Sequence, residues 1–493
     1  MSKYSMIVIG VLAVYMVFNL IVGIVVSKRQ EKKQSKGFVN DYFIGGRSMG
    51  GLVLAMTLIA TFASASSFIG GPGMAYTTGL VWVLLSVIQV PTAFVILGIL
   101  GKKFAIISRK TNAVTITDYL KVRYKSPAVV ILAGLGMVLF FIAQMISQFM
   151  GGAVLLESMT GISYVNGLIL FGAIVILYTS IGGFKAVVTT DTIQAIIMVI
   201  GCFLILFTVV KEAGGYGQLV DTMNQVAPHW TSIDSNGATP MPTVLSFWVT
   251  VGVGVLGLPQ TAVRCMGFKD TKSLHSAMII GTIVVSILMF VTVVVGVFAN
   301  AVITPAELPT SDYVIPAIVL KYMNPWVAGL FIAAPLSAVM STVSSLLILA
   351  SATIIKDIYL TYVVKKEPNE DKGQARTEKK IGRMSMLTTL VIGILVIVLT
   401  INPPDLIVWI NIFAMGGLEC TFLCPILFGL YWKKANATGC IFSIIAGVGS
   451  FIAISSSGMS FFGFSAIVPA IMIAVLAFVV GSLIGDKRQA VAS

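Results

Sequence analysis

Two stretches of oxygen-bearing residues interrupt otherwise apolar segments and could together bind a small cation. The first is "ATFASASSFIGGPG" at residues 60–73, which holds four Ser or Thr residues followed by three Gly and a Pro. Backbone groups freed by a helix break in lipid have no water to bond, so they need another partner. The second, around residues 335–357, places Ser337, Ser341, Ser344 and Ser345 largely on one helical side.

A desolvated hard cation needs several carbonyl and hydroxyl oxygens close together. The alternative for the second stretch is that each hydroxyl bonds back to its own helix, which is common in membrane spans. Beside a broken helix with freed carbonyls, however, the hydroxyls predict the second wall of a sodium site.

Another interruption, "VGVGVLGLPQ" at residues 251–260, occupies the corresponding position five spans later. Glycine and proline also occur in membrane helices simply because they permit close packing, and one break alone would favour that explanation. Two breaks at matching positions in oppositely oriented spans instead predict inverted repeats with a binding site at the membrane midplane.

The composition indicates that these interruptions lie within a membrane protein. Of 493 residues, 57% are hydrophobic and 10% are charged, and the mean hydropathy is +0.99, whereas soluble domains carry roughly 25% charged residues. The apolar runs predict thirteen spans. They are 4–26, 48–76, 80–101, 127–156, 162–181, 188–210, 243–264, 276–300, 325–351, 384–401, 405–431, 437–457 and 462–484.

The basic residues predict the orientation of these spans. With the N-terminus outside, all of the 32 Lys and Arg residues except Lys3, Lys211 and Lys321 fall in inward loops, which predicts an N-out, C-in topology. The net charge of +13 therefore reflects topology and contact with anionic lipid, and does not indicate nucleic-acid binding. The first run lacks the charge order of a cleavable signal, so it is predicted to be a retained span.

Several motifs resemble those of the sodium/solute symporter family across nearly the whole chain. They are "YFIGGRSMGG", the broken second span, "YTSIGGFKAVVTTDTIQA" and "AVMST"; "GLPQTAVRC", "GGLE" and "GLYWKKANA" are most similar to the family members that transport pantothenate. The resemblance implies an all-α integral membrane protein with a leucine-transporter-like fold and alternating access.

One transmembrane domain, 1–493, is then expected. It would contain an extra N-terminal span at 4–26, inverted five-helix repeats at 48–210 and 243–431, and extra C-terminal spans at 437–484.

The family's conserved sodium site carries over to this chain by motif matching. The resemblance implies carbonyl ligands from Ala60, Ala63 and Ala338, and hydroxyl ligands from Ser341 and Thr342. Proline-type members carry Asp, and sugar-type members Asn, where this chain has Phe62. The implied site is therefore built from neutral oxygens.

Two charged residues are implied to lie along the ion route. Asp191 matches an acidic residue near the inward sodium path of relatives, and Arg47 an arginine on the cytoplasmic side of that path.

The predicted substrate-facing side chains surround the breaks. They are Ser64, Ser67, Gln89, Gln148 and Gln260. Ser67 and Gln89 match sugar-contacting positions of relatives, whereas Gln148 and Gln260 are inferred from depth and neighbourhood, with a packing role open for each. Arg264 is expected to be a cytoplasmic anchor at the inward end of its span, and for Glu419 a structural and a functional role are equally open.

The expected function is sodium-coupled uptake of pantothenate across the bacterial cytoplasmic membrane. Na⁺ is the coupling ion, and no cofactor and no nucleic-acid partner are expected. The alternative is the same symport of another small organic anion or zwitterion, such as an amino acid. A channel is less favoured because no filter-like repeat occurs, and a membrane enzyme because no nucleophile–base pair or metal cluster does. The sequence does not predict an oligomeric state.

Overall fold

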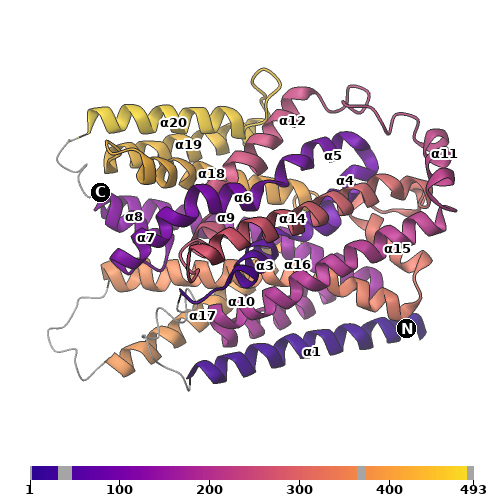
Figure 1. Cartoon of the computed structure of the whole chain (residues 1–493), viewed down its shortest axis with the longest axis horizontal. Helices are drawn as coiled ribbons and strands as arrows, with labels where there is room; N and C mark the ends of the chain where they lie inside the picture. Colours follow the sequence, from indigo (N-terminus) through magenta and orange to yellow (C-terminus); the bar gives the residue numbers. More distant parts are fainter. Residues whose placement is uncertain (1–2, 32–46, 364–373, 486–493) are drawn as a thin grey trace.

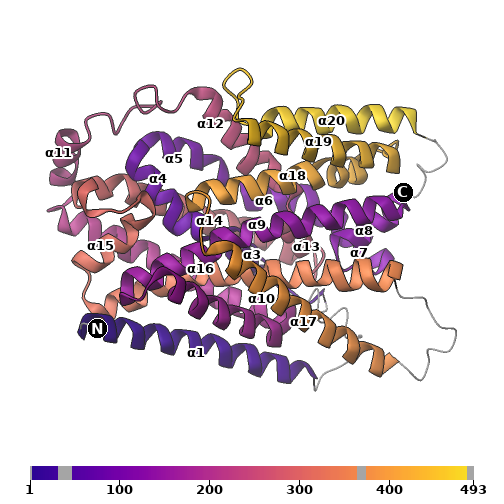
Figure 2. The same ribbon diagram turned by 180° about the vertical axis from the view of Figure 1, so that it is seen from behind.

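The computed structural model describes residues 3–31, 47–363 and 374–485, and nearly all of them are helical. The helices lie side by side along the long axis of the molecule (Figure 1). α1 (Lys3–Glu31) runs along one edge, and α19 (Ala437–Ser457) and α20 (Ile467–Ile484) run along the opposite edge (Figures 1 and 2). The helices between these two edges hold the site.

Ten helices in the described residues are long and apolar enough to cross a membrane, or eleven if a bent pair counts as one span. The predicted all-α membrane class is therefore confirmed, while the count of thirteen stays a prediction. The long helices not yet given are α9 (Pro127–Thr160), α10 (Tyr164–Glu212), α14 (Thr271–Phe298), α16 (Pro325–Ala352), α17 (Gln374–Thr400) and α18 (Ile407–Tyr431). α16 continues as a π-helix over Thr353–Val363.

Helix α10 contains two of the predicted spans. Its 49 residues would extend about 74 Å if straight, at 1.5 Å per residue. Tyr178 nevertheless lies close enough to Thr190 and Asp191 to interact with them. α10 therefore departs from a straight course between the apolar stretches Tyr164–Ser180 and Val187–Glu212, which correspond to the predicted spans 162–181 and 188–210.

Helix α16 forms the centre of the bundle. It packs against α1, α9, α10 and α3 (Gly51–Phe62), and every residue from Phe331 to Ala352 is buried. Its hydroxyl groups thus face protein on all sides and have no access to lipid or bulk water.

The first interruption lies earlier in the chain than its glycines suggest. α3 ends at Phe62, Ala63 is extended, and the chain resumes as a π-helix over Ser66–Gly70 and then as α4 (Gly71–Thr78), with a 69° bend. The break lies near the start of the quoted stretch 60–73 and not at its glycines and proline, because Gly70, Gly71, Pro72 and Gly73 are all helical. A Cβ on Gly73 would lie 2.3 Å from the Ser311 carbonyl oxygen, so this glycine serves close packing.

The second interruption matches its predicted position. α12 (Met241–Trp248) passes into a π-helix over Val249–Val253 and a 3₁₀-helix over Gly254–Gly257. Leu258 is extended before α13 (Pro259–Arg264), as the steric demand of a following proline requires.

The remaining α-helices are short. They are α5 (Leu80–Ser86), α6 (Thr92–Ile96), α7 (Lys102–Thr111), α8 (Ile116–Tyr124), α11 (Tyr216–Val226) and α15 (Val314–Tyr322). α11 lies between the predicted spans 188–210 and 243–264. Of the basic residues that predict the orientation, those at 28–47 and 356–383 lie partly outside the described residues, and the pair at 487–488 lies wholly outside them.

Candidate sodium and substrate site

The five residues predicted to bind sodium meet where the first break faces α16. The Ser341 Oγ lies 2.7 Å from the Ala60 carbonyl oxygen, and the Thr342 Oγ1 lies 2.8 Å from that of Ala63. The Ala338 carbonyl oxygen lies 3.1 Å from the Ser341 Oγ and 2.9 Å from the Thr342 Oγ1. All five residues are fully buried, so the cluster offers uncharged oxygens in a water-poor setting.

The hydroxyls of Ser341 and Thr342 bond back to their own helix and also face the carbonyls of the broken helix. The Ser341 Oγ is also 2.8 Å from the Ser337 carbonyl of its own helix, which is the usual back-bond of a membrane serine. The same hydroxyls reach across to the carbonyls of Ala60 and Ala63, which are near the end of α3. This arrangement gives the freed backbone oxygens partners and supplies the ligand type that a hard cation prefers.

Gln148 stabilises the first break from the opposite side. Its Oε1 accepts a hydrogen bond of 2.8 Å from the Ala65 N–H, and its Nε2 lies 3.0 Å from the Ser147 Oγ. Gln148 does not line the adjoining cavity. The structure thus places this predicted substrate residue behind the broken helix.

A cavity lies between the two breaks. Four of the predicted substrate residues line it: Ser64, Ser67, Gln89 and Gln260. Phe62 also lines it. The sequence interpretation missed further polar lining side chains, namely Trp82, Ser86, Gln144, Thr292 and Asn411.

Three carboxamides from three helices form a connected series along this cavity. The Gln260 Nε2 donates to the Gln144 Oε1 at 3.3 Å, and the Gln144 Nε2 donates to the Asn411 Oδ1 at 3.4 Å. The Gln260 Oε1 is buried without a hydrogen-bond partner in the described part of the chain. Gln144 precedes Gln148 by one helical turn, and this spacing on one face was the signal that could have found it.

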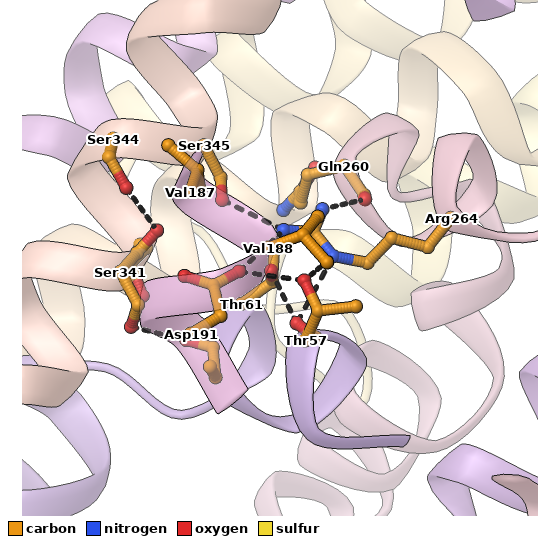
Figure 3. Close-up of polar contacts among 12 residues, drawn as sticks. Thr57, Thr61, Val187, Val188, Asp191, Gln260, Arg264, Ser341, Ser344 and Ser345 are labelled. Atoms are coloured by element: carbon orange, nitrogen blue, oxygen red, sulfur yellow. Dashed lines mark hydrogen bonds and ion pairs between the residues drawn. The ribbon is translucent and has the colours of Figure 1, made fainter. Parts of the chain in front are cut away.

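A buried ion pair lies against Thr57 of α3 (Figure 3). The Arg264 Nη2 is 3.4 Å from the Asp191 Oδ2, and both side chains are fully buried. Thr57 donates to the same Asp191 oxygen at 2.7 Å and accepts from the Arg264 Nε through its carbonyl at 3.1 Å.

Arg264 also donates to the Gln260 carbonyl at 2.7 Å and to the Ser345 Oγ at 2.8 Å. The expectation that Arg264 is a cytoplasmic anchor is therefore wrong. The Arg264 side chain points into the protein because Asp191 and three further oxygen acceptors bind it there.

Arg47 lies apart from this pair. Its Nη2 donates to the Ser108 carbonyl at 2.9 Å and to the Ala113 carbonyl at 3.3 Å. Its backbone has a φ of 56°, in the left-handed region that non-glycine residues seldom adopt. The structure brings Arg47 together with the segment between α7 and α8, and gives it no contact with Asp191.

Comparison with known proteins gives this geometry a context. The model of the sodium:solute symporter family matches residues 42–447. The chain is 48% identical to the sodium/pantothenate symporter of Haemophilus influenzae, over 92% of this chain and 93% of that protein. It is 46% identical to the sodium/pantothenate symporter of Escherichia coli, over 96% of each chain.

Among solved structures, a Na⁺-coupled sialic acid symporter in a substrate-bound, outward-open state superimposes with a TM-score of 0.80. The match covers 97% of this chain and 96% of that one at 21% identity, and that structure is described as revealing a novel Na⁺ site. At this identity the match concerns the fold, and it confirms the expected transporter architecture.

Proposed function

The chain belongs to the sodium:solute symporter family, and we propose that it couples Na⁺ entry to the uptake of pantothenate by alternating access. The family carries out sodium-coupled solute transport, and the protein is a multi-pass protein of the bacterial inner membrane, not an enzyme. The observation that carries the proposal is the convergence of carbonyl and hydroxyl oxygens between the first break and α16.

In the proposed sodium site, the carbonyls of Ala60, Ala63 and Ala338 and the hydroxyls of Ser341 and Thr342 coordinate the ion. The ion would replace the hydrogen bonds that now join these oxygens. A neutral set of ligands holds Na⁺ without the strong attraction of a carboxylate, which suits a site that must release its ion in every cycle. Asp191 and Arg47 would act later, on the inward path.

In the proposed substrate site, the polar cavity wall matches the groups of pantothenate. Its amide can exchange hydrogen bonds with the series formed by Gln260, Gln144 and Asn411, in which the Gln260 Oε1 lacks a partner among the described residues. Its hydroxyls can bond Ser64, Ser67 and Gln89. Its carboxylate can lie near the start of the helical stretch that follows the first break, where backbone N–H groups favour an anion.

We further propose thirteen crossings with the N-terminus outside and the C-terminus inside. The ten long apolar helices, the bent pair, and the shorter apolar helices Tyr164–Ser180 and Met241–Gly257 together support this number. α1 begins at the end of the bundle opposite to the end at which α20 finishes (Figure 1), as an odd number of crossings requires. The inverted repeats 48–210 and 243–431 would each begin with a broken helix.

Uptake of labelled pantothenate into proteoliposomes tests this function. We expect accumulation with an inward Na⁺ gradient and none when choline replaces Na⁺. Excess unlabelled pantothenate should abolish uptake of the label, whereas amino acids such as proline should not. Equal uptake in choline would contradict sodium coupling, and stronger competition by an amino acid would favour the alternative substrate class.

A further inference from the structure

Glu419 is a buried carboxylate that the proposed sodium and substrate sites leave unused. It is 1% exposed, and neither of its oxygens has a hydrogen-bond partner in the described ranges. Asn411, Met415 and Glu419 follow one another at four-residue spacing, on one face of α18. Because Asn411 and Met415 line the cavity, Glu419 lies one turn beyond it on the same face.

The carboxylate rests directly on the second helix break. A Cβ added to Gly254 would lie 2.2 Å from the Glu419 carboxyl carbon and 2.2 Å from its Oε2. Gly254 begins the 3₁₀ turn that ends at Gly257, and Pro259 has no N–H with which to continue the hydrogen-bond ladder. Unwound backbone of this kind supplies carbonyl oxygens to the coupling ions of transporters with broken helices.

No described cationic side chain neutralises Glu419. The helices packed on α18 include α8, α9, α19 and α20. The charged residues of these helices are Asp118, Lys121 and Arg123 in α8 and Glu157 in α9, and the nearby titratable thiols are Cys420, Cys424 and Cys440. None of them forms an ion pair or a hydrogen bond with Glu419.

Three of these four charged residues are engaged elsewhere, and Lys121 is exposed. Arg123 donates to the carbonyls of Gly429 and Trp432, Asp118 pairs with Lys356, and Glu157 accepts from Tyr313. A buried carboxylate without a partner is costly as a bare anion, so a cation must neutralise it.

We infer that Glu419, against the unwound turn at Gly254, is a second cation-binding group that takes up a Na⁺ or a proton in each transport cycle. This inference rests on the proposed function. It adds one positive charge to each turnover, because one Na⁺ with a monovalent anion such as pantothenate is electrically neutral and a second cation is not.

The membrane potential tests the inference. With the Na⁺ gradient fixed and the potential set by K⁺ and valinomycin, the wild-type protein should accumulate about fiftyfold more pantothenate at −100 mV than at zero potential, since one charge across 100 mV is worth about 2.3 kcal/mol. Glu419→Gln should lose this response and keep Na⁺-driven uptake, while Glu419→Asp should retain part of it. A Glu419→Gln variant that responds like the wild type would overturn the inference.

A second measurement needs no variant. The charge moved per pantothenate by the wild-type protein should be one positive charge, and a value of zero would overturn the inference even if Glu419→Gln does not fold. The uptake ratio of ²²Na⁺ to pantothenate separates the two cations. Two Na⁺ per solute indicates sodium at Glu419, and one Na⁺ with acidification of the lumen indicates a proton. Wild-type protein without any Na⁺-dependent pantothenate uptake would instead contradict the proposed function.

Discussion

The two interrupted helices share one sequence feature, glycine and proline inside an apolar stretch, but the structure surrounds them with different chemistry. The first break faces the hydroxyls of Ser341 and Thr342 and is held by Gln148. The second faces Glu419, and Gln260 and Arg264 extend from the helix that follows it.

A helix break by itself provides only free backbone groups. The side chains of the helices packed against it determine which ligand the break can bind. α16 turns the first break into a neutral oxygen site. α9 and α18 place carboxamides and a carboxylate beside the second. The four predictions below test this division, beginning with the largest expected effect.

Arg264 joins the two breaks, and its loss should have the largest effect. It binds the Thr57 carbonyl in α3 and the Gln260 carbonyl in α13, and Arg264→Met would leave Asp191 buried without its cation. Breaking a buried pair in this way costs about 3–5 kcal/mol. We expect a clear fall in the melting temperature of the purified protein and loss of uptake.

Arg109→Met is the matched control for that variant, because Arg109 binds the carbonyls of Phe268 and Lys269 at a more exposed position. Its melting temperature should stay close to that of the wild type. Adding Asp191→Asn to Arg264→Met should restore part of the lost stability, since it removes the uncompensated charge. If the double variant is less stable than Arg264→Met, the ion pair with Asp191 is not the source of the stability that Arg264 contributes.

The hydroxyl pair on α16 should determine the affinity for sodium and not the affinity for the substrate. Ser341→Ala combined with Thr342→Ala removes two oxygens that would each contribute roughly 1.5 kcal/mol to a charged partner. The half-saturating Na⁺ concentration should therefore rise about a hundredfold. Ser351→Ala, which removes a buried hydroxyl of the same helix that binds the Ser385 carbonyl, should leave it unchanged. Unchanged sodium dependence in the double variant would exclude the pair as ligands.

Gly73 tests whether the glycines of the first break serve packing. In Gly73→Ala the new Cβ would press on the Ser311 carbonyl oxygen at 2.3 Å, and overpacking of this kind costs about 1–3 kcal/mol. Gly449→Ala in α19 is the control, since a Cβ there would meet nothing within 4 Å. Melting curves of the two variants should separate them. Equal melting temperatures would mean that the contact at Ser311 relaxes freely.

Much of this arrangement was predictable from local sequence. Long apolar runs predicted the helices, and Pro259 marked the second break because the residue before a proline is driven into an extended conformation. The five residues proposed to bind sodium were predicted by resemblance, and the structure brings them together. None of these inferences required knowing which helices pack against each other.

What the sequence did not reveal depends on contacts between distant segments. Arg264 looked like a surface anchor because its partners, Asp191 and Ser345, are 73 and 81 residues away. Gln148 looked like a substrate ligand because depth alone cannot say which side of a broken helix a side chain faces. The glycines of the first interruption did not mark its break, because glycines required by packing at Ser311 and Val408 look the same in sequence as glycines required by a turn.

Two glutamines on one helix offer the smallest and most selective test of the comparison. Gln144 and Gln148 are one turn apart in α9, but Gln144 bonds Gln260 beside the second break and Gln148 bonds the Ala65 N–H at the first. Gln144→Met should raise the half-saturating pantothenate concentration about tenfold, because about 1.4 kcal/mol of hydrogen bonding is lost, and leave the sodium dependence unchanged.

Gln148→Met should act mainly on sodium, because a misplaced Ala65 shifts the carbonyl of Ala63 within the proposed sodium site, whereas pantothenate would lose only the alignment of Ser64 and Ser67. Uptake measured first against the Na⁺ concentration and then against the pantothenate concentration distinguishes the two variants. Each variant serves as the control for the other. Since both substitutions have the same chemistry and lie on the same helix, opposite effects on sodium and pantothenate could come only from the break that each glutamine touches. If both variants weaken sodium and pantothenate equally, the two breaks act as one site and the division between them is wrong.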